Sequence, residues 1–442
     1  MLEKLHAKVG DFWWYSAMIF LACRLGDGIQ AFIGLWLVPK YVGTQELGAV
    51  IPLQSLAGFL TTPLAIIAVV FSKYVNVYAT RGEYGKVRSF IRDVFGATAL
   101  LFFICLVGAY LVMPFFYERL RVASGSLTFL ILLCGLMGNV GTIVTSAQQG
   151  LKRFKTMSIM NILSAPIRLV TLLIAMPIRA LSVYILGQTT PTATTSALSI
   201  LDIHKALKGY TPDTSWRRDL PAIWKYLWPY AICTIFGSFA GIMVATVYRQ
   251  RLPEVESAAY YMLTRFSDIA AFVAATINII LFPLASEAHE KGKDDSSLMT
   301  RSILATIGGS IVLALIFWFA AQPVFSLTET WRTYLPYASL LPILTISTGI
   351  GLSSGIISNY EFACNRIGAT ILNVVLNFAW AGILVSFTGA DFFIGILPES
   401  IIRAMHAARF DDLGHLLAYT IVFQLFLLAA LTLLARRNCK TE

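Results

Sequence analysis

The chain has 442 residues, of which 57% are hydrophobic and only 13% are charged. A soluble globular protein carries about 25% charged residues, so this balance excludes that class and indicates a polytopic membrane protein. The formal net charge of +10 does not indicate nucleic-acid binding, because the basic residues form short clusters between apolar runs. Such clusters are typical of loops beside an anionic cytoplasmic leaflet.

Apolar runs bounded by charged or turn residues predict helices that are long enough to cross a bilayer. In the first half these runs lie near residues 12–38, 47–71, 94–116, 127–146, 157–178 and 181–201. In the second half they lie near 226–247, 258–285, 303–321, 335–357, 367–387 and 413–434. The sequence therefore predicts an all-α polytopic membrane protein with about twelve transmembrane helices.

The polar stretch 202–225 divides these runs, so we expect two six-helix bundles, 1–201 and 226–442, joined by a cytoplasmic linker. Residues 390–412 begin apolar but then carry several charges, and we expect an exterior or interfacial excursion there. The run 12–38 is too long for the apolar core of a signal peptide, so we expect it to remain as an anchor.

The distribution of basic residues predicts the topology, because short cytoplasmic loops hold the excess of Lys and Arg. With the N-terminus inside, 22 of the 34 Lys and Arg residues fall in inner segments and 9 in outer segments, Arg249 among the latter. This split predicts that both termini are cytoplasmic. The six cysteines lie in apolar spans or in segments expected inside, and neither they nor the histidines show a metal-ligand spacing.

The two halves resemble each other at nearly one offset. A shift of 210 residues aligns Gly48 with Ala258, and shifts of 211 or 212 align Phe71 with Phe282 and Asn161 with Asn373. An even number of helices in each half makes such repeats parallel, related by an axis along the membrane normal. The general similarity of membrane helices remains an alternative explanation.

Three local patterns connect the chain to a known family. They are LVPKYVG at 37–43 followed by ELG at 46–48, QQGLKRF at 148–154, and FPLASE at 282–287. With these patterns, residues 10–390 resemble the polysaccharide transporters of the MOP superfamily, the Wzx-type O-antigen flippases, and more distantly the MATE antiporters and the lipid II flippase. The segment 390–412 departs from the family pattern, which has a plain helix at that place.

The resemblance implies two six-helix bundles in a V around a central cavity. It also implies that the protein moves undecaprenyl-pyrophosphate-linked oligosaccharide from the inner to the outer leaflet of a bacterial inner membrane. The expected partners are this lipid-linked substrate, membrane lipids, and a polymerase with other polysaccharide-assembly proteins. We expect a monomer.

Three arginines lie inside expected helices, at Arg24, Arg168 and Arg265. Arginine stays charged and binds phosphate oxygens with two parallel hydrogen bonds, so these residues are candidates for holding the pyrophosphate. Asp27 and Asp268 each lie three residues after an arginine, and we expect them to support the arginines or to take part in coupling. Structural ion pairs explain both arrangements as well.

Arg168 differs from the other two because its own helix contains no carboxylate, so it needs a partner from elsewhere or an anionic ligand. Candidate contacts to sugar hydroxyls are Gln30, Gln54, Asn278, Asn373 and Asn377. Hydrogen bonds between helices are an alternative role for these amides.

Two other functions remain open. A cation-coupled drug exporter of the MATE type needs an unpaired carboxylate in its cavity, and the neighbouring arginine argues against Asp27 in that role. A membrane-embedded glycosyltransferase or polymerase needs a sizeable aqueous loop with acidic residues, whereas the longest polar stretch is short. We therefore expect a non-enzyme with no cofactor, and proton or sodium coupling remains open.

Overall fold

The structure of the chain is a computed structural model. It describes residues 28, 35–36, 38–41, 43–112, 114, 125–151, 153–175, 181–290, 296–364, 366–388, 398–400, 403, 407 and 411–438. Most of the expected first helix, including Arg24, Asp27 and Gln30, lies outside the described residues, as does most of the expected excursion at 390–412.

The described helices group into two compact units. The first unit spans Leu53–Ser238 and holds the second part of α4 (Thr44–Leu60), then α5 (Thr62–Thr80), α6 (Tyr84–Val112), α8 (Gly125–Gly150), α9 (Phe154–Ala175), α10 (Leu181–Leu207), the 3-10 helix η3 (Thr214–Asp219) and the first part of α11 (Leu220–Arg251).

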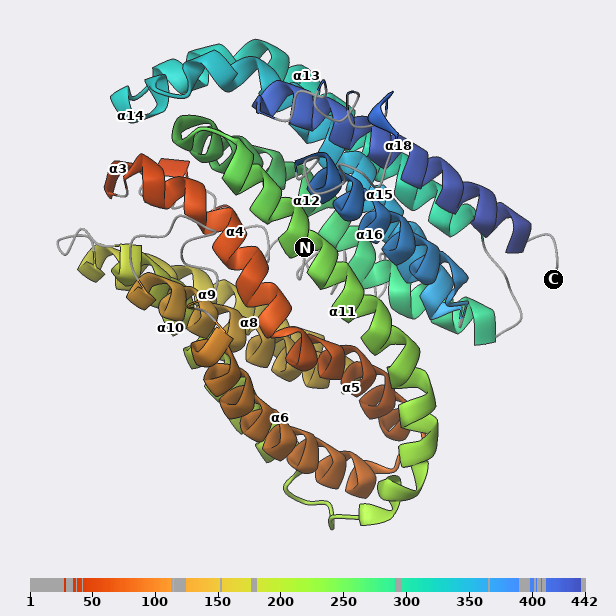
Figure 1. The fold of residues 1–442 in the computed structure, drawn as a ribbon. Coiled ribbons are helices and arrows are strands. Elements are labelled where there is room, and N and C mark those ends of the chain that lie inside the picture. Colours follow the sequence, from red (N-terminus) through yellow and green to blue (C-terminus); the bar gives the residue numbers. More distant parts are fainter. Residues whose placement is uncertain are drawn as a thin grey trace, which may run out of the picture. The chain divides into compact units, whose positions relative to one another are not determined.

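The second unit takes in Gly34–Pro52 and Phe239–Glu442. It holds α3 (Val38–Tyr41), the first part of α4, the end of α11, α12 (Glu254–Glu290), α13 (Ser296–Ser326), α14 (Glu329–Arg332), η4 (Leu335–Leu340), α15 (Leu341–Ala363), α16 (Gly368–Thr388) and α18 (Leu413–Asn438). In Figure 1 α15 lies among α12, α13, α16 and α18, the helices it packs against.

The predicted all-α, multi-pass membrane fold is confirmed. Among the described residues, seven helices are long and apolar enough to cross a membrane, judged by length and composition. They are Thr62–Thr80, Tyr84–Val112, Thr214–Arg251, Ser297–Ser326, Leu335–Ala363, Gly368–Phe387 and Leu413–Asn438. Large apolar side chains stay exposed on them, such as Phe103 and Phe319 at 63% and 77%, as expected of a surface that faces lipid.

One predicted helix, 47–71, is wrong as a single element, because the structure divides it at Thr61. Pro63 lies in the first turn of α5, where a missing backbone N–H costs least, so a new helix begins there. The Thr61 hydroxyl donates to the Ala57 carbonyl at 2.8 Å and accepts from the Asn139 amide of α8 at 2.7 Å. The break is therefore fixed from within the first unit.

The predicted helix 226–247 ends too early, because Arg249, which was counted with the outer segment that follows it, still belongs to a helix. Helix α11 continues to Arg251, and Arg249 is only 1% exposed within the second unit. Its guanidinium donates to the Gln45 carbonyl at 3.2 Å and fills the space that a Cβ at Gly48 would need. The side chain thus fastens α11 to the first turns of α4.

The residues of the expected linker, 202–225, comprise the end of α10, η3 and the start of α11. They dock on α6: Trp216 is buried and packs edge-on against Phe90, with ring centroids 5.0 Å apart. Asp213 donates its N–H to the Gly85 carbonyl at 3.1 Å, and its carboxylate accepts from Ser215 at the start of η3. Hydrogen bonds from the Ser215 backbone and hydroxyl lower the pKa of the Asp213 carboxyl below its usual range.

We predict that Gly85→Ala loosens this docked segment. A Cβ at Gly85 would lie 2.6 Å from the Thr211 carbonyl oxygen, so the backbone has to shift. Overpacking of this kind costs about 1–3 kcal/mol, and thermal unfolding of the purified protein in detergent should show a lower midpoint.

The matched control is Gly96→Ala on the same helix, where a Cβ meets nothing within 4 Å. Both variants add one methyl group to α6, and only that of Gly85→Ala meets another segment, so a lower midpoint for Gly85→Ala than for Gly96→Ala reports the contact with Thr211. Equal midpoints would contradict the close docking of this segment.

Candidate functional site: a polar cavity between α8, α9 and α10

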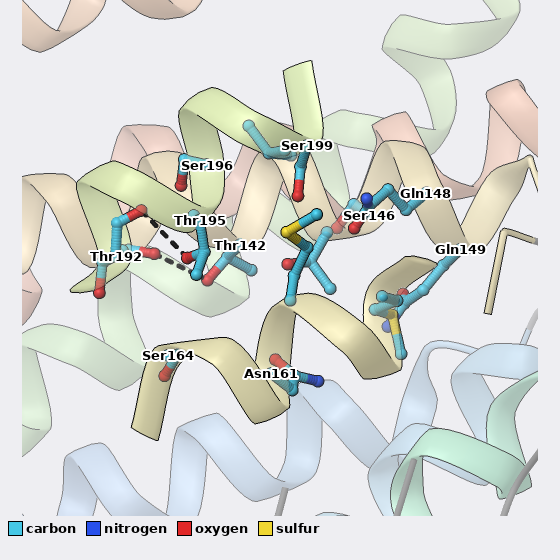
Figure 2. A pocket seen from close by; sticks show the side chains of 16 residues that line it. Thr142, Ser146, Gln148, Gln149, Asn161, Ser164, Thr192, Thr195, Ser196 and Ser199 are labelled. Atoms are coloured by element: carbon cyan, nitrogen blue, oxygen red, sulfur yellow. Dashed lines mark hydrogen bonds between the residues drawn. The ribbon is translucent and has the colours of Figure 1, made fainter. Parts of the chain in front are cut away.

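A cavity of about 340 Å³ lies between three helices of the first unit. Its wall consists almost entirely of hydroxyl, amide and small side chains (Figure 2). The lining residues are Gly138, Gly141, Thr142, Val144, Thr145, Ser146, Gln148, Gln149, Met157, Met160, Asn161, Ser164, Thr192, Thr195, Ser196 and Ser199. None of these lining residues is charged.

The spacing of the lining residues explains how a helical sequence builds this wall. On α10, Thr192, Thr195 and Ser199 recur every three or four residues, which places them on one face of the helix. Small residues let that face come close to α8, since a Cβ at Gly141 would lie 2.8 Å from the methyl group of Thr192. Figure 2 shows Thr142 and Thr195 beside each other across the two helices.

The threonine hydroxyls bond to their own helices. Thr195 donates to the Pro191 carbonyl at 2.9 Å, and Thr142 donates to the Gly138 carbonyl at 3.1 Å. Each hydroxyl oxygen still has lone pairs that can accept a hydrogen bond. This part of the wall therefore suits a ligand that donates hydrogen bonds, such as a sugar hydroxyl or water.

An ion pair lies one helical turn beyond the cavity. Arg153 precedes Met157 by four residues, and Asp202 follows Ser199 by three. The Arg153 Nε and Nη2 atoms donate to the two Asp202 carboxylate oxygens, both at 2.7 Å. The pair ties the start of α9 to α10 with bidentate geometry.

Arg168 marks the other end of the polar face. It follows Ser164 by four residues on α9 and is half-buried, and the helix continues through Pro166. Cys134 of α8 lies close to both Arg168 and Thr189 of α10. Three helices thus meet around this arginine.

The other predicted site residues lie in the second unit or on α4. Arg265 and Asp268 of α12 form the ion pair that their spacing indicates, with Nη1 and Oδ2 3.0 Å apart. The guanidinium also lies over the Tyr261 ring, 5.0 Å from its centroid. Gln54 is exposed on α4, and Asn278 belongs to α12 but its side chain lies outside the described residues.

The predicted amides Asn373 and Asn377 of α16 bond to each other and to α15. Asn377 donates to the Asn373 side-chain oxygen at 2.6 Å, and Asn373 donates to the Ser358 hydroxyl at 2.9 Å. Of the predicted residues, the structure therefore brings together Arg265 with Asp268 and Asn373 with Asn377. Arg168 belongs to the other unit.

The cavity itself was not predicted from the sequence. Its signal was present in the threonines of the run 181–201, which recur at helical spacing, but the same residues also suit a satisfied helix surface. In the part of the chain that the structure describes, no group of His, Cys, Asp and Glu side chains could hold a metal ion.

An all-helical chain with several apolar spans and a polar cavity between them defines a multi-pass membrane protein. Comparison with solved structures specifies the fold further. The chain is similar to a multidrug resistance MATE transporter of the MOP superfamily in its outward-facing form, with a TM-score of 0.67, 12% identity, and coverage of 98% of this chain and 97% of the other. The inward-facing form of such a transporter gives a TM-score of 0.63, 14% identity and coverage of 96% of both chains.

A third similar structure is a MOP-superfamily transporter from Pyrococcus furiosus, with a TM-score of 0.65, 12% identity, and coverage of 97% of this chain and 96% of the other. That transporter is described as having a binding pocket of reverse polarity, which suggests a different function for it. No family model matches the chain, and no curated protein matches it. At these identities the likeness shows the fold, which is that of the MOP-superfamily transporters.

We predict that the cavity holds water. In a variant without native cysteines, Asn161→Cys should react with a small charged methanethiosulfonate at least about tenfold faster than Ile162→Cys, because such reagents need an aqueous thiolate. Ile162 is the adjacent residue and is 45% exposed on the apolar outside of α9, so it is the matched control. Equal rates would contradict a wet cavity.

Proposed function

We propose that the protein is a flippase that moves undecaprenyl-pyrophosphate-linked oligosaccharide from the inner to the outer leaflet by alternating access. The observation that carries this proposal is the uncharged, hydroxyl-rich cavity, with Arg168 one helical turn beyond its lining residue Ser164 on α9. Sugar hydroxyls can donate to the threonine oxygens, and a guanidinium can bind phosphate oxygens. The volume of the cavity, about 340 Å³, lies within the range of small-molecule sites in proteins.

The charge of the cavity favours this substrate over a cationic drug. A cation that leaves water needs an anionic partner, and the residues that line the cavity include no carboxylate. In the second unit, the Asp268 carboxylate is paired with Arg265. The Pyrococcus transporter, whose binding pocket of reverse polarity suggests a different function, gives a precedent for varied pocket polarity within this fold.

Transport rather than enzymatic turnover fits the similar structures, which are transporters. Asp412 of the adjacent pair Asp411-Asp412 accepts a hydrogen bond from the His415 N–H at 3.1 Å, which caps the start of α18. That contact gives it a structural role. This structural role argues against Asp412 as part of a glycosyltransferase or polymerase site.

The proposed function implies a membrane location and partner proteins. It would lie in a bacterial inner membrane with both termini in the cytoplasm and act as a monomer. It would pass its lipid-linked substrate to a polymerase and other polysaccharide-assembly proteins. Asp268, and Asp27 outside the described residues, are the candidate groups for proton or sodium coupling.

We predict that Arg168→Ala abolishes leaflet transfer while the protein still reaches the membrane, and that Arg168→Lys retains part of the activity. Loss of a charged hydrogen-bonding partner costs about 1.5–3 kcal/mol, a factor of roughly 10–150 in affinity for phosphate. The measurement is exposure of a labelled lipid-pyrophosphate oligosaccharide on vesicles that contain the purified protein.

The control is Arg92→Ala, which removes the same charge from an ion pair with Asp93 on α6, away from the cavity. It should transfer substrate like the unaltered protein. Normal transfer by Arg168→Ala would contradict the assignment of this arginine, and export of a cationic drug without glycan transfer would favour the MATE-type function.

A further inference from the structure

The ion pair between Arg153 and Asp202 has a counterpart in the second unit at an offset of 213 residues. The Arg153 N–H donates to the Gln148 carbonyl at 2.9 Å, and the Arg366 N–H donates to the Glu361 carbonyl at 2.8 Å. In both units this turn joins two consecutive helices, α8 to α9 and α15 to α16. An arginine therefore follows the same backbone turn in each unit.

The two arginines have different surroundings. Arg366 lies 3.5 Å from Glu361, and their side chains are 11% and 0% exposed. Asn438 of α18 donates to the same carboxylate at 2.8 Å, so this cluster is sealed inside the protein. It has the character of a permanent structural contact.

The counterpart in the first unit is open. The side chains of Arg153 and Asp202 are 35% and 24% exposed. The position that corresponds to Glu361 holds Gln148, which lines the cavity, and the carboxylate comes instead from α10. The same arginine thus lies beside a cavity and has a partner that can be exchanged.

We propose that the Arg153 guanidinium is a phosphate-binding group at the end of the cavity, and that the Asp202 carboxylate occupies it when no substrate is bound. This inference rests on the proposed function and names the group that first receives the pyrophosphate. A phosphate presents the same two-oxygen geometry as a carboxylate and carries more charge, so it can replace Asp202. An ion pair that is about one-third exposed is screened by water and is therefore weak enough to exchange.

The surrounding charges favour an anion at this end. Lys155 on α9 and Lys205 on α10 are exposed near the pair, and His204 is exposed beside Lys205. With Asp202 neutralised by Arg153, the two lysines leave the local charge positive. An incoming phosphate would be attracted before it meets the guanidinium.

The positions of the two arginines give the substrate a path. Arg153 and Arg168 are separated by fifteen residues of α9, or about 22 Å along a helix with a rise of 1.5 Å per residue. The cavity lies between them. Under the proposed topology Arg153 is at the cytoplasmic end, where a substrate from the inner leaflet arrives.

The experiment measures binding of farnesyl pyrophosphate to the purified full-length protein in nanodiscs by isothermal titration calorimetry. Arg153→Gln should weaken binding by about tenfold or more, because it removes a charge-assisted pair of hydrogen bonds. Asp202→Asn should tighten binding about three- to tenfold, because it removes the competing carboxylate and keeps the arginine. Arg153→Lys should fall between Arg153→Gln and the unaltered protein.

The opposite directions of these two variants separate a binding role from a structural one. Both substitutions break the ion pair, so a purely structural contact predicts that they change binding in the same direction or not at all, and either result overturns the proposal. If Arg153→Gln fails to fold, Asp202→Asn alone still tests the proposal, because unchanged or weaker binding by Asp202→Asn refutes the phosphate-binding role of Arg153. Arg92→Gln on α6 is the matched control and should bind like the unaltered protein.

Competition identifies the part of the probe that is recognised. Inorganic pyrophosphate should displace farnesyl pyrophosphate, and farnesol should not; displacement by farnesol alone would overturn a phosphate site. The glycan-transfer assay separates the two proposals. Arginine-dependent binding without glycan transfer would leave this site standing and refute the flippase function, whereas glycan transfer with unaltered binding by Arg153→Gln would do the reverse.

Discussion

The structure depends on one constraint: a polar group inside a bilayer must find a partner, because lipid offers none. Helices satisfy their backbone groups internally, and a threonine or serine can donate its hydroxyl to a carbonyl one turn earlier. Thr142 and Thr195 do so, which lets α8 and α10 carry polar faces without a charged residue. What remains is a set of acceptor lone pairs that face a cavity. The polar wall of the cavity is thus a consequence of how these helices satisfy their polar groups within a membrane.

The two units use this chemistry in different ways. In the second unit the polar groups bond to one another: Ser347 donates to Gln424 at 2.6 Å, and Asn373 donates to Ser358 at 2.9 Å. In the first unit α8, α9 and α10 surround a cavity of about 340 Å³. The polar side chains therefore bond to one another between the helices of the second unit and line a cavity between those of the first, although both units contain the same backbone turn at Gln148 and Glu361.

The sequence predicted the features that depend on the hydropathy and spacing of many neighbouring residues. Helix type and apolar spans follow from many residues at once, and the pairing of Arg265 with Asp268 follows from spacing on one helix. It could not predict contacts made across distant segments. Arg249 was assigned to a loop because nothing nearby in sequence indicates that Gln45 would accept its hydrogen bond. The docking of Trp216 on α6 was missed for the same reason, since a polar stretch with three scattered aromatic residues is equally typical of a free linker.

Charge distribution connects the fold to the choice of substrate. A cavity that holds a fixed carboxylate attracts cations. In a cavity without one, the charged residues at its ends decide whether cations or anions are attracted. Here the uncharged wall lies between Arg153 and Arg168, and the Asp202 carboxylate is already bound by one of them. An anionic head followed by neutral, hydroxylated groups matches that order of charges, with hydroxyl donors facing threonine acceptors along the wall. Under the proposed function, the charges at the two ends of this polar face, rather than the fold itself, would select a lipid-linked glycan.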